Sequence, residues 1–327
     1  MPVRTVAPYW VERHVPAMGS SAHLVIGDAG DDLVGWALDE LERLEQCWSR
    51  FRPDSELCRL NQRAGEWVDA SAPMINAISS ARELWEATSG AFDPTILDGL
   101  EHAGYDRSFE LVAPVESVES VESVASVESV ASVELTAGAS GPAPGFGSVE
   151  IDRAARRVRL VAGTRIDLGG IGKGLAADLV AQGLVDRGAR TALVALGGDM
   201  RACGAAPEPN SWIVPIEDPC DDTRVAFEYP LHEGGLVTST TRIRRWVRGG
   251  RVMHHIIDPS TGVPTANGIA AVVVAARSAW WAEGIAKAMI VAGRESVETL
   301  ARRAGVRAWC FLDDGSSFAT AAQPGPA

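Results

Sequence analysis

The spacing of apolar residues along the chain predicts both helices and strands. Over residues 31–49, apolar side chains recur at positions 34, 37, 38, 41, 44 and 48, which is the spacing of an amphipathic helix. Similar patterns predict helices over 173–187 and 279–292. Shorter alternating or wholly apolar runs predict strands. These runs cover 149–160, with a turn at 153–155, and 164–168, 191–196, 212–217, 252–257 and 270–276.

The predicted helices and strands do not follow the strict βαβ order of a parallel sheet. Their order favours an α+β architecture, with a mainly antiparallel sheet flanked by helices, over a doubly wound fold. The chain has 327 residues, of which 46% are hydrophobic, so it can bury a full core as one large domain or as two lobes.

A repeated segment interrupts this pattern. Residues 115–134 read VESVESVESVASVESVASVE, and this three-residue period fits neither a strand nor the apolar stripe of a helix. The segment carries five glutamates and no basic residue, and a Gly/Pro-rich linker follows it. We therefore interpret 115–145 as a low-complexity insert and expect it to be a disordered surface excursion.

The net charge of -13 limits the classes of partner. Binding of nucleic acid requires clustered Lys and Arg, and the only such cluster lies at 242–251, so we expect no nucleic-acid partner. A small anionic ligand remains compatible with this charge, because the local field decides its binding. Only two of the 30 basic residues are lysines, Lys173 and Lys287, so a lysine is unusual at any position of this chain.

The cysteines and the apolar runs bear on location. Five scattered cysteines without a CxxC pair argue against a disulfide framework and against a zinc site, and they fit a reducing compartment. Residues 1–19 lack the apolar core and cleavage site of a secretion signal, and no cysteine is placed to carry a lipid. The apolar run at 269–276 is too short to span a bilayer. We therefore expect a cytoplasmic protein without a membrane anchor.

A glycine-rich segment between a predicted strand and a predicted helix is the first candidate for ligand chemistry. Residues 167–174 read DLGGIGKG. Glycines let backbone N–H groups approach an anion, the helix N-terminus adds a favourable dipole, and Lys173 adds a positive charge. The segment matches neither the P-loop nor the dinucleotide-binding fingerprint. Taken alone, a tight turn that needs glycine for steric reasons explains it about as well.

Further short motifs accompany this segment. GGD stands at 197–199, TSTT at 238–241, HIIDPSTGVP at 255–264 and GAFDPT at 90–95, with additional matches at 18–19, 49–51, 55–57 and 61. Each motif is weak by itself. Together, in this order and over about residues 18 to 293, they resemble the FAD:protein FMN transferases, the ApbE-type flavin transferase family. The resemblance implies a T-fold-like architecture and a single domain over 1–327 that carries the insert.

The resemblance also implies an activity. Members of this family transfer the FMN half of FAD to a threonine hydroxyl of a target flavoprotein and release AMP. Two alternatives stay open at this stage, an FAD-binding protein without transferase activity and an FAD pyrophosphatase. The expected partners are therefore FAD and a threonine-bearing target flavoprotein. Positions implied to bind FAD are Met18, Ser49, Asp93, Gly169, Gly170, Lys173, Gly198, Asp199, Thr240 and His255.

Two adjacent histidines need separate treatment. Neighbouring residues of a strand point to opposite faces, so His254 and His255 cannot bind one metal together. His255 precedes Ile-Ile-Asp-Pro as the histidine of the family does, and we take it as the candidate base for the incoming hydroxyl. A structural histidine bonded to a backbone carbonyl is the alternative. Asp258 is assigned a catalytic role by the resemblance, although it also begins a D-P-S-T-G turn.

The chain departs from the family at the metal site. The resemblance implies an Asp and, four residues later, a Thr on the last helix as Mg²⁺ ligands, joined by a backbone carbonyl at the position of Gly172. Here these helix positions are Glu283, still a hard oxygen ligand, and Lys287, whose ammonium has no lone pair. One explanation for these two residues is an ordinary i,i+4 Glu–Lys pair on one face of the helix. The rarity of lysine favours a second hypothesis, that Lys287 stands at the vacated metal position, paired to Glu283, where it takes a catalytic role.

Overall fold

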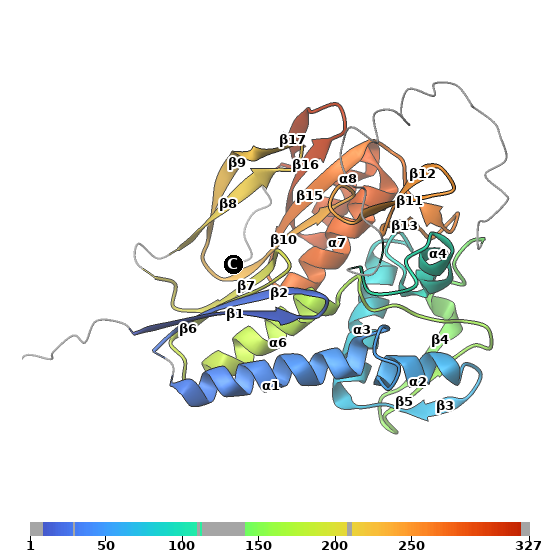
Figure 1. Ribbon diagram of the computed structural model, residues 1–327, viewed down its shortest axis with the longest axis horizontal. Helices are drawn as coiled ribbons and strands as arrows, with labels where there is room; N and C mark the ends of the chain where they lie inside the picture. Colours follow the sequence, from blue (N-terminus) through green and yellow to red (C-terminus); the bar gives the residue numbers. More distant parts are fainter. Residues whose placement is uncertain (1–8, 29, 110–111, 113–140, 208–210, 322–327) are drawn as a thin grey trace, which may run out of the picture.

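The computed structural model of the chain describes residues 9–28, 30–109, 112, 141–207 and 211–321 (Figure 1). The predicted repeat at 115–134 lies outside the described residues, as does the predicted insert except for 141–145. None of the helices in the described ranges combines the length and apolarity that a membrane crossing requires.

An eight-stranded sheet forms the centre of the fold. Every neighbouring pair in it is antiparallel, which confirms the predicted strand arrangement. The order across the sheet is β1 (Trp10–Ala17), β2 (Ser20–Gly27), β6 (Thr191–Leu196), β7 (Asp199–Gly204), β10 (Gly234–Thr240), β15 (Ile269–Ala276), β16 (Arg307–Leu312) and β17 (Ser317–Ala319).

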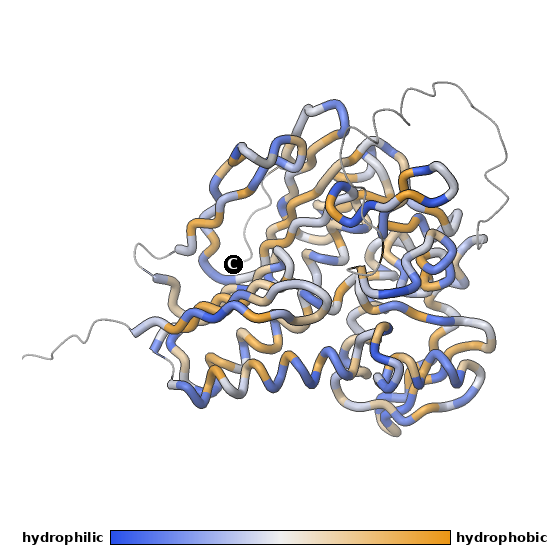
Figure 2. The backbone as a smooth tube through the Cα atoms, in the orientation of Figure 1, coloured by the Kyte–Doolittle hydropathy of each residue, from blue (hydrophilic) through white to orange (hydrophobic). Residues whose placement is uncertain are grey.

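Helices cover one face of this sheet (Figure 1). They are α1 (Asp31–Trp48), α6 (Gly172–Asp186), α7 (Ala279–Ala292) and α8 (Arg294–Ala304). Figure 2 shows polar and apolar residues alternating along α1, at the bottom of the view. The sheet presents Val194, Leu196 and Val272 to the helices, and together they form the main core. Both α6 and α7 carry site residues.

A β-hairpin covers part of the opposite face. It consists of β8 (Trp212–Asp218) and β9 (Asp221–Leu231). Because side chains alternate between the two faces of a strand, Leu193 and Val273 point away from the helices and pack against Val214 and Leu231 of the hairpin. The sheet is therefore apolar on both faces over its middle strands.

The remaining elements gather beyond one end of the main sheet. They are α2 (Glu56–Gln62), β3 (Trp67–Asp69), α3 (Ala72–Ala87), the 3₁₀ turn η1 (Pro94–Ile96), α4 (Leu97–His102), the 3₁₀ turn η3 (Phe146–Ser148), β4 (Val149–Asp152), β5 (Arg157–Leu160), β11 (Arg245–Arg248), β12 (Arg251–His254), β13 (Ile257–Asp258) and β14 (Val263–Pro264).

Two of the strand predictions need correction. Residues 164–168 form no strand, because Ile166 exchanges hydrogen bonds of 2.9 Å with the side chain of Asn61 instead of a neighbouring strand. The strand predicted over 252–257 is split into β12 and the start of β13. The break covers His255 and Ile256, where Ile256 N donates to the side chain of His254 instead of to a neighbouring strand. The helices over 31–49, 173–187 and 279–292 are confirmed to within one residue at each end.

Candidate functional site

A pocket of about 290 Å³ opens where several of these elements meet. The β1–β2 turn, the end of α1, the segment before α6, the break after β12 and one side of α7 all contribute to its wall. A pocket of this size suits one end of a small-molecule ligand. Nine of the residues expected at the site line it: Met18, Ser49, Asp93, Gly169, Gly170, Gly172, Lys173, His255 and Lys287.

The β1–β2 turn brings Met18 to the pocket. Met18 and Gly19 both have positive φ, 53° and 62°, which is the conformation of a type I′ hairpin turn. Such a φ is uncommon for a residue with a side chain. The backbone N–H of Met18 donates to Glu45 Oε2 of α1 at 2.8 Å, and this bond holds the turn over the pocket.

The glycine-rich segment lies close to other parts of the chain. A Cβ added to Gly170 would lie 2.8 Å from the ring of Phe92, and one added to Gly174 would lie 2.6 Å from the backbone of Ala279. Glycine at 174 therefore lets α6 and α7 approach. The N-terminus of α6 lies at the pocket wall, where the helix dipole favours an anion, although Gly172 N and Gly174 N already donate to Leu168 O and Glu283 Oε2.

Four charged side chains meet beside this helix terminus. Lys173 Nζ bonds to Asp199 Oδ2 and lies 2.7 Å from Glu283 Oε1, and Lys287 Nζ lies 2.9 Å from the same oxygen. The second oxygen, Glu283 Oε2, accepts from Gly174 N at 2.8 Å. Glu283 is completely buried, and Asp199 is 2% exposed. Two ammonium groups thus balance two carboxylates, and both lysines of the chain belong to this cluster.

The pKa values of the cluster follow from burial and pairing. Burial opposes the charge of Glu283, but the Lys173 and Lys287 ammonium groups outweigh it and lower the pKa of Glu283 to about 2. For Asp199, burial outweighs Lys173 and raises the pKa to about 6. Burial also lowers the pKa of Lys287, against the attraction of Glu283. Glu283 is therefore the most strongly ionised carboxylate of the cluster.

This cluster does not fit a magnesium ion. Glu283 Oε1 accepts from both lysines and Oε2 accepts from Gly174 N, so three of the four lone pairs that a hard divalent cation could use are taken. The Lys287 ammonium offers no lone pair and would repel the ion. The predicted Glu283–Lys287 pair is present. The ammonium of Lys287, rather than the number of protein oxygens, decides against the ion, because Mg²⁺ usually completes its six positions with water and substrate oxygens.

The two adjacent histidines have different surroundings. His254 Nδ1 accepts from Ile256 N, and its Nε2 lies 2.9 Å from Thr265 O, so Nε2 carries the proton and His254 is held by the backbone. His255 lines the pocket, and its buried Nδ1 has no hydrogen-bond partner in the part of the chain that the structure describes. Burial, with Arg244 and Lys287 nearby, holds the pKa of His255 well below its usual range. His255 is therefore neutral at pH 7.

Five expected site residues do not line the pocket: Gly198, Asp199, Thr240, Asp258 and Glu283. Asp199 and Glu283 act on the pocket only through the lysines. Thr240 Oγ1 donates to Ala270 O at 3.0 Å. Asp258 Oδ1 accepts from the N–H and hydroxyl of Ser260, which is a turn contact. Gly198 has a φ of 92°, which explains glycine in the turn before β7 without a ligand.

Asp93 lines the pocket but is also tied into the fold. Its Oδ1 accepts from Thr95 N and Thr95 Oγ1, and its Oδ2 lies 3.1 Å from Trp85 Nε1. Burial raises the pKa of Asp93, against these hydrogen bonds. It therefore caps the η1 turn at the pocket wall.

Several pocket residues were not singled out from the sequence. The Arg50 guanidinium stacks on Phe51 and Tyr105, at 4.1 and 4.5 Å from the ring centroids, and its buried Nη2 has no hydrogen-bond partner among the described residues. Arg244 also lines the pocket and bonds to the Tyr105 hydroxyl at 3.0 Å. In a chain so rich in arginine, neither cation stands out. The motif match at 49–51 was the signal that could have indicated Arg50.

Fold and pocket together define an α+β protein with a site for an anionic ligand that has an aromatic part. Cations and a helix N-terminus supply the anion-binding groups, and Phe51, Phe92 and Tyr105 supply aromatic surface. Comparisons with known proteins give the same class. The ApbE family model matches residues 18–310. The chain belongs to the ApbE family, which confirms the predicted resemblance.

The relatives include FAD:protein FMN transferases from two bacteria. The chain is 31% identical over 280 residues to that of Treponema pallidum, covering 80% of this chain and 72% of the relative. Its identity to that of Salmonella typhimurium is 26% over 284 residues, covering 84% and 75%.

Solved structures support the fold. The ApbE protein of Thermotoga maritima superposes with a TM-score of 0.80 at 29% identity, covering 95% of this chain and 97% of that one. The apo form of the Pseudomonas stutzeri flavinyl transferase ApbE gives a TM-score of 0.76 at 25% identity, covering 97% and 96%. The predicted α+β, ApbE-type fold is thereby confirmed.

Proposed function

We propose that this protein is an FAD:protein FMN transferase, which moves FMN from FAD to a threonine hydroxyl of a target flavoprotein and releases AMP. The observation that carries the proposal is a neutral His255 in the same pocket wall as the N-terminus of α6. A base and an anion-binding terminus facing one pocket suit a displacement at phosphorus. The names of the relatives support FAD as the donor.

In the proposed reaction, the threonine oxygen bonds to the phosphorus of the FMN half. The bond from this phosphorus to the bridging oxygen breaks, and AMP leaves with the electron pair. His255 takes the hydroxyl proton. Arg244 offsets part of the charge of the pyrophosphate, and the ring of Phe92 or Tyr105 supports the flavin. Lys173 and Lys287, whose charges are balanced by Asp199 and Glu283, offer N–H donors to the phosphate oxygens. Met18, Ser49, Asp93, Gly169 and Gly170 position the ligand, whereas Asp199 and Glu283 orient the two lysines.

Incubation with FAD and a threonine-bearing fragment of a target flavoprotein tests the proposal. The expected result is a mass increase of the fragment equal to one FMN, together with release of AMP. Titration calorimetry should show one FAD bound per chain, more tightly than FMN, because contacts to the AMP half are lost in FMN. If FAD and FMN bind equally or undetectably, the proposal is wrong.

One observation favours a second candidate, an FAD-binding protein without transferase activity. Lys287 supplies one positive charge to Glu283, where the family resemblance implies a divalent ion, and an ammonium cannot act as a Lewis acid. This candidate predicts FAD binding with no mass change of the acceptor fragment under any condition.

The cytoplasmic location remains a prediction, supported by five free thiols.

Magnesium dependence distinguishes this chain from a protein with a metal site. We expect FAD affinity and FMN transfer to change less than about twofold between EDTA and excess Mg²⁺, because Glu283 is already neutralised by two lysines. The matched variant is Glu283→Asp with Lys287→Thr, which restores the ligand types implied by the resemblance and should respond to Mg²⁺. Strong activation of the unmodified protein by Mg²⁺ would show that an ion displaces Lys287.

A further inference from the structure

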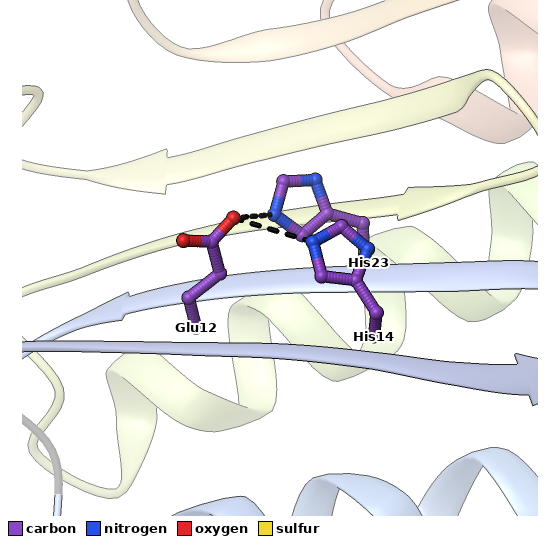
Figure 3. Close-up of side chains that lie close together, drawn as sticks. All are labelled: Glu12, His14 and His23. Atoms are coloured by element: carbon purple, nitrogen blue, oxygen red, sulfur yellow. Dashed lines mark hydrogen bonds and ion pairs between the residues drawn. The ribbon is translucent and has the colours of Figure 1, made fainter.

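A second cluster of ligand side chains lies on the β1–β2 hairpin, away from the pocket. Glu12, His14 and His23 project from the same face of the two strands (Figure 3). His23 Nε2 lies 2.7 Å from Glu12 Oε1, and His14 Nε2 lies 3.3 Å from the same oxygen. The two imidazole rings are stacked, with centroids 3.9 Å apart. None of the three residues lines the pocket.

The strand register brings these residues together. His14 and His23 are directly opposite each other in the β1–β2 pair, and Glu12 precedes His14 by two residues, which keeps it on the same face. This is the face opposite the helices, because Ala22, Leu24 and Ile26 point to the main core. Adjacent histidines of one strand cannot share an ion, whereas a cross-strand pair can.

The cluster is not required for packing. The side chains of Glu12 and His14 are 61% and 65% exposed, and that of His23 is 34% exposed. The β8–β9 hairpin covers this face of the sheet over its middle strands and reaches the start of β1, where Trp212 contacts Trp10. The three ligand side chains therefore remain open to solvent, on strands that the sheet holds in place.

We propose that Glu12, His14 and His23 form a Zn²⁺-binding site. Two imidazole nitrogens and one carboxylate oxygen are a ligand set that zinc accepts, with water in the fourth position. Zinc bonds of 2.0–2.2 Å in a tetrahedron require ligand atoms roughly 3.3 Å apart. The three ligand atoms here all lie within 4.8 Å of one another, and the two stacked rings must tilt apart for both nitrogen lone pairs to point at one ion. The site contains no thiol, and the cysteine pattern that argued against a zinc site could not indicate it.

Zinc titration of the full chain tests this site. Protein freed of metal with a chelator, then separated from it, is titrated with Zn²⁺ by calorimetry, with Cys220→Ser in every variant to remove the exposed thiol. We expect one Zn²⁺ per chain. His14→Ala and His23→Ala should each weaken binding at least tenfold, in line with the ~10–100-fold cost of losing even an outer-shell partner. His102→Ala, a change of an exposed histidine on α4, should leave the affinity unchanged.

Long-range ¹H–¹⁵N NMR of the histidine rings gives a second readout that does not depend on a variant. Zn²⁺ should shift the Nε2 signals of His14 and His23 and leave those of His102 in place. The proposal is wrong if Zn²⁺ does not bind in a 1:1 ratio, if both alanine variants bind Zn²⁺ as tightly as the protein with both histidines, or if the ring signals do not move. FAD affinity measured in parallel keeps this test separate from the proposed transferase activity.

Discussion

Replacing Glu283 with Gln is expected to lower the free energy of unfolding by about 3–5 kcal/mol, the usual effect of removing one partner from a buried ion pair. Glu283 has no exposed surface and accepts hydrogen bonds from Lys173, Lys287 and Gly174 N. Glutamine keeps one acceptor oxygen but no charge, so Lys287 loses the only carboxylate that the described residues place within hydrogen-bond distance of it. Chemical denaturation of the two proteins measures the difference.

The matched control is Glu83→Gln, on the exposed side of α3, which should change stability by less than about 0.5 kcal/mol. Acid adds a second check. The folded pKa of Glu283, about 2, is below its ordinary value of 4.5, so its contribution is complete above pH 4.5 and is lost as pH falls toward 2. In Glu283→Gln this part of the acid sensitivity should be absent. An unchanged stability would mean that the cluster does not hold α6 to α7.

Local patterns predicted those elements whose signal lies within one stretch of chain. The apolar stripe of α1 and the mostly apolar run of β6 both appear in the structure within one residue of the expected bounds. The order of strands did not follow from such signals. The pairing of β2 with β6 joins residues far apart in sequence, with α1, α3 and α6 between them. The strand predicted over 164–168 was wrong because the side chain of Asn61, and not a neighbouring strand, forms the backbone hydrogen bonds of Ile166.

The candidate site shows the same limit. The spacing of Glu283 and Lys287 within one helix predicted their pair, which the structure contains. The contact of Lys173 with Glu283 spans 110 positions and depends on how α6 packs against α7. Gly174 permits that packing, since any side chain there would meet the backbone of Ala279. The glycine-rich motif and the Glu283–Lys287 pair were thus visible in the sequence, whereas the ion pairs of Lys173 with Asp199 and Glu283 were not.

Replacing His255 with Ala is expected to lower the rate of FMN transfer by about 10²–10⁴-fold, the range for loss of a general base. His255 lines the pocket, and its lowered pKa keeps the imidazole unprotonated at neutral pH. FAD affinity should change little, because the cations and the α6 terminus stay in place. The rate of the unmodified protein should be flat near pH 7 and fall only below pH 6.5, since acid must protonate a base of lowered pKa. Transfer to an acceptor fragment under saturating FAD measures both effects.

His254→Ala is the matched control for this change. His254 lies next to His255 but is 9% exposed and bonded through both nitrogens to the backbone of Ile256 and Thr265. Its loss removes two buried hydrogen bonds, so stability should fall by about 1–3 kcal/mol while the transfer rate per folded molecule is retained. If His255→Ala keeps the full rate, or if the acid limb of the unmodified protein lies above pH 6.5, another group accepts the proton. In that case His255 would have a structural role, like that of His254, although the described residues give its Nδ1 no hydrogen-bond partner.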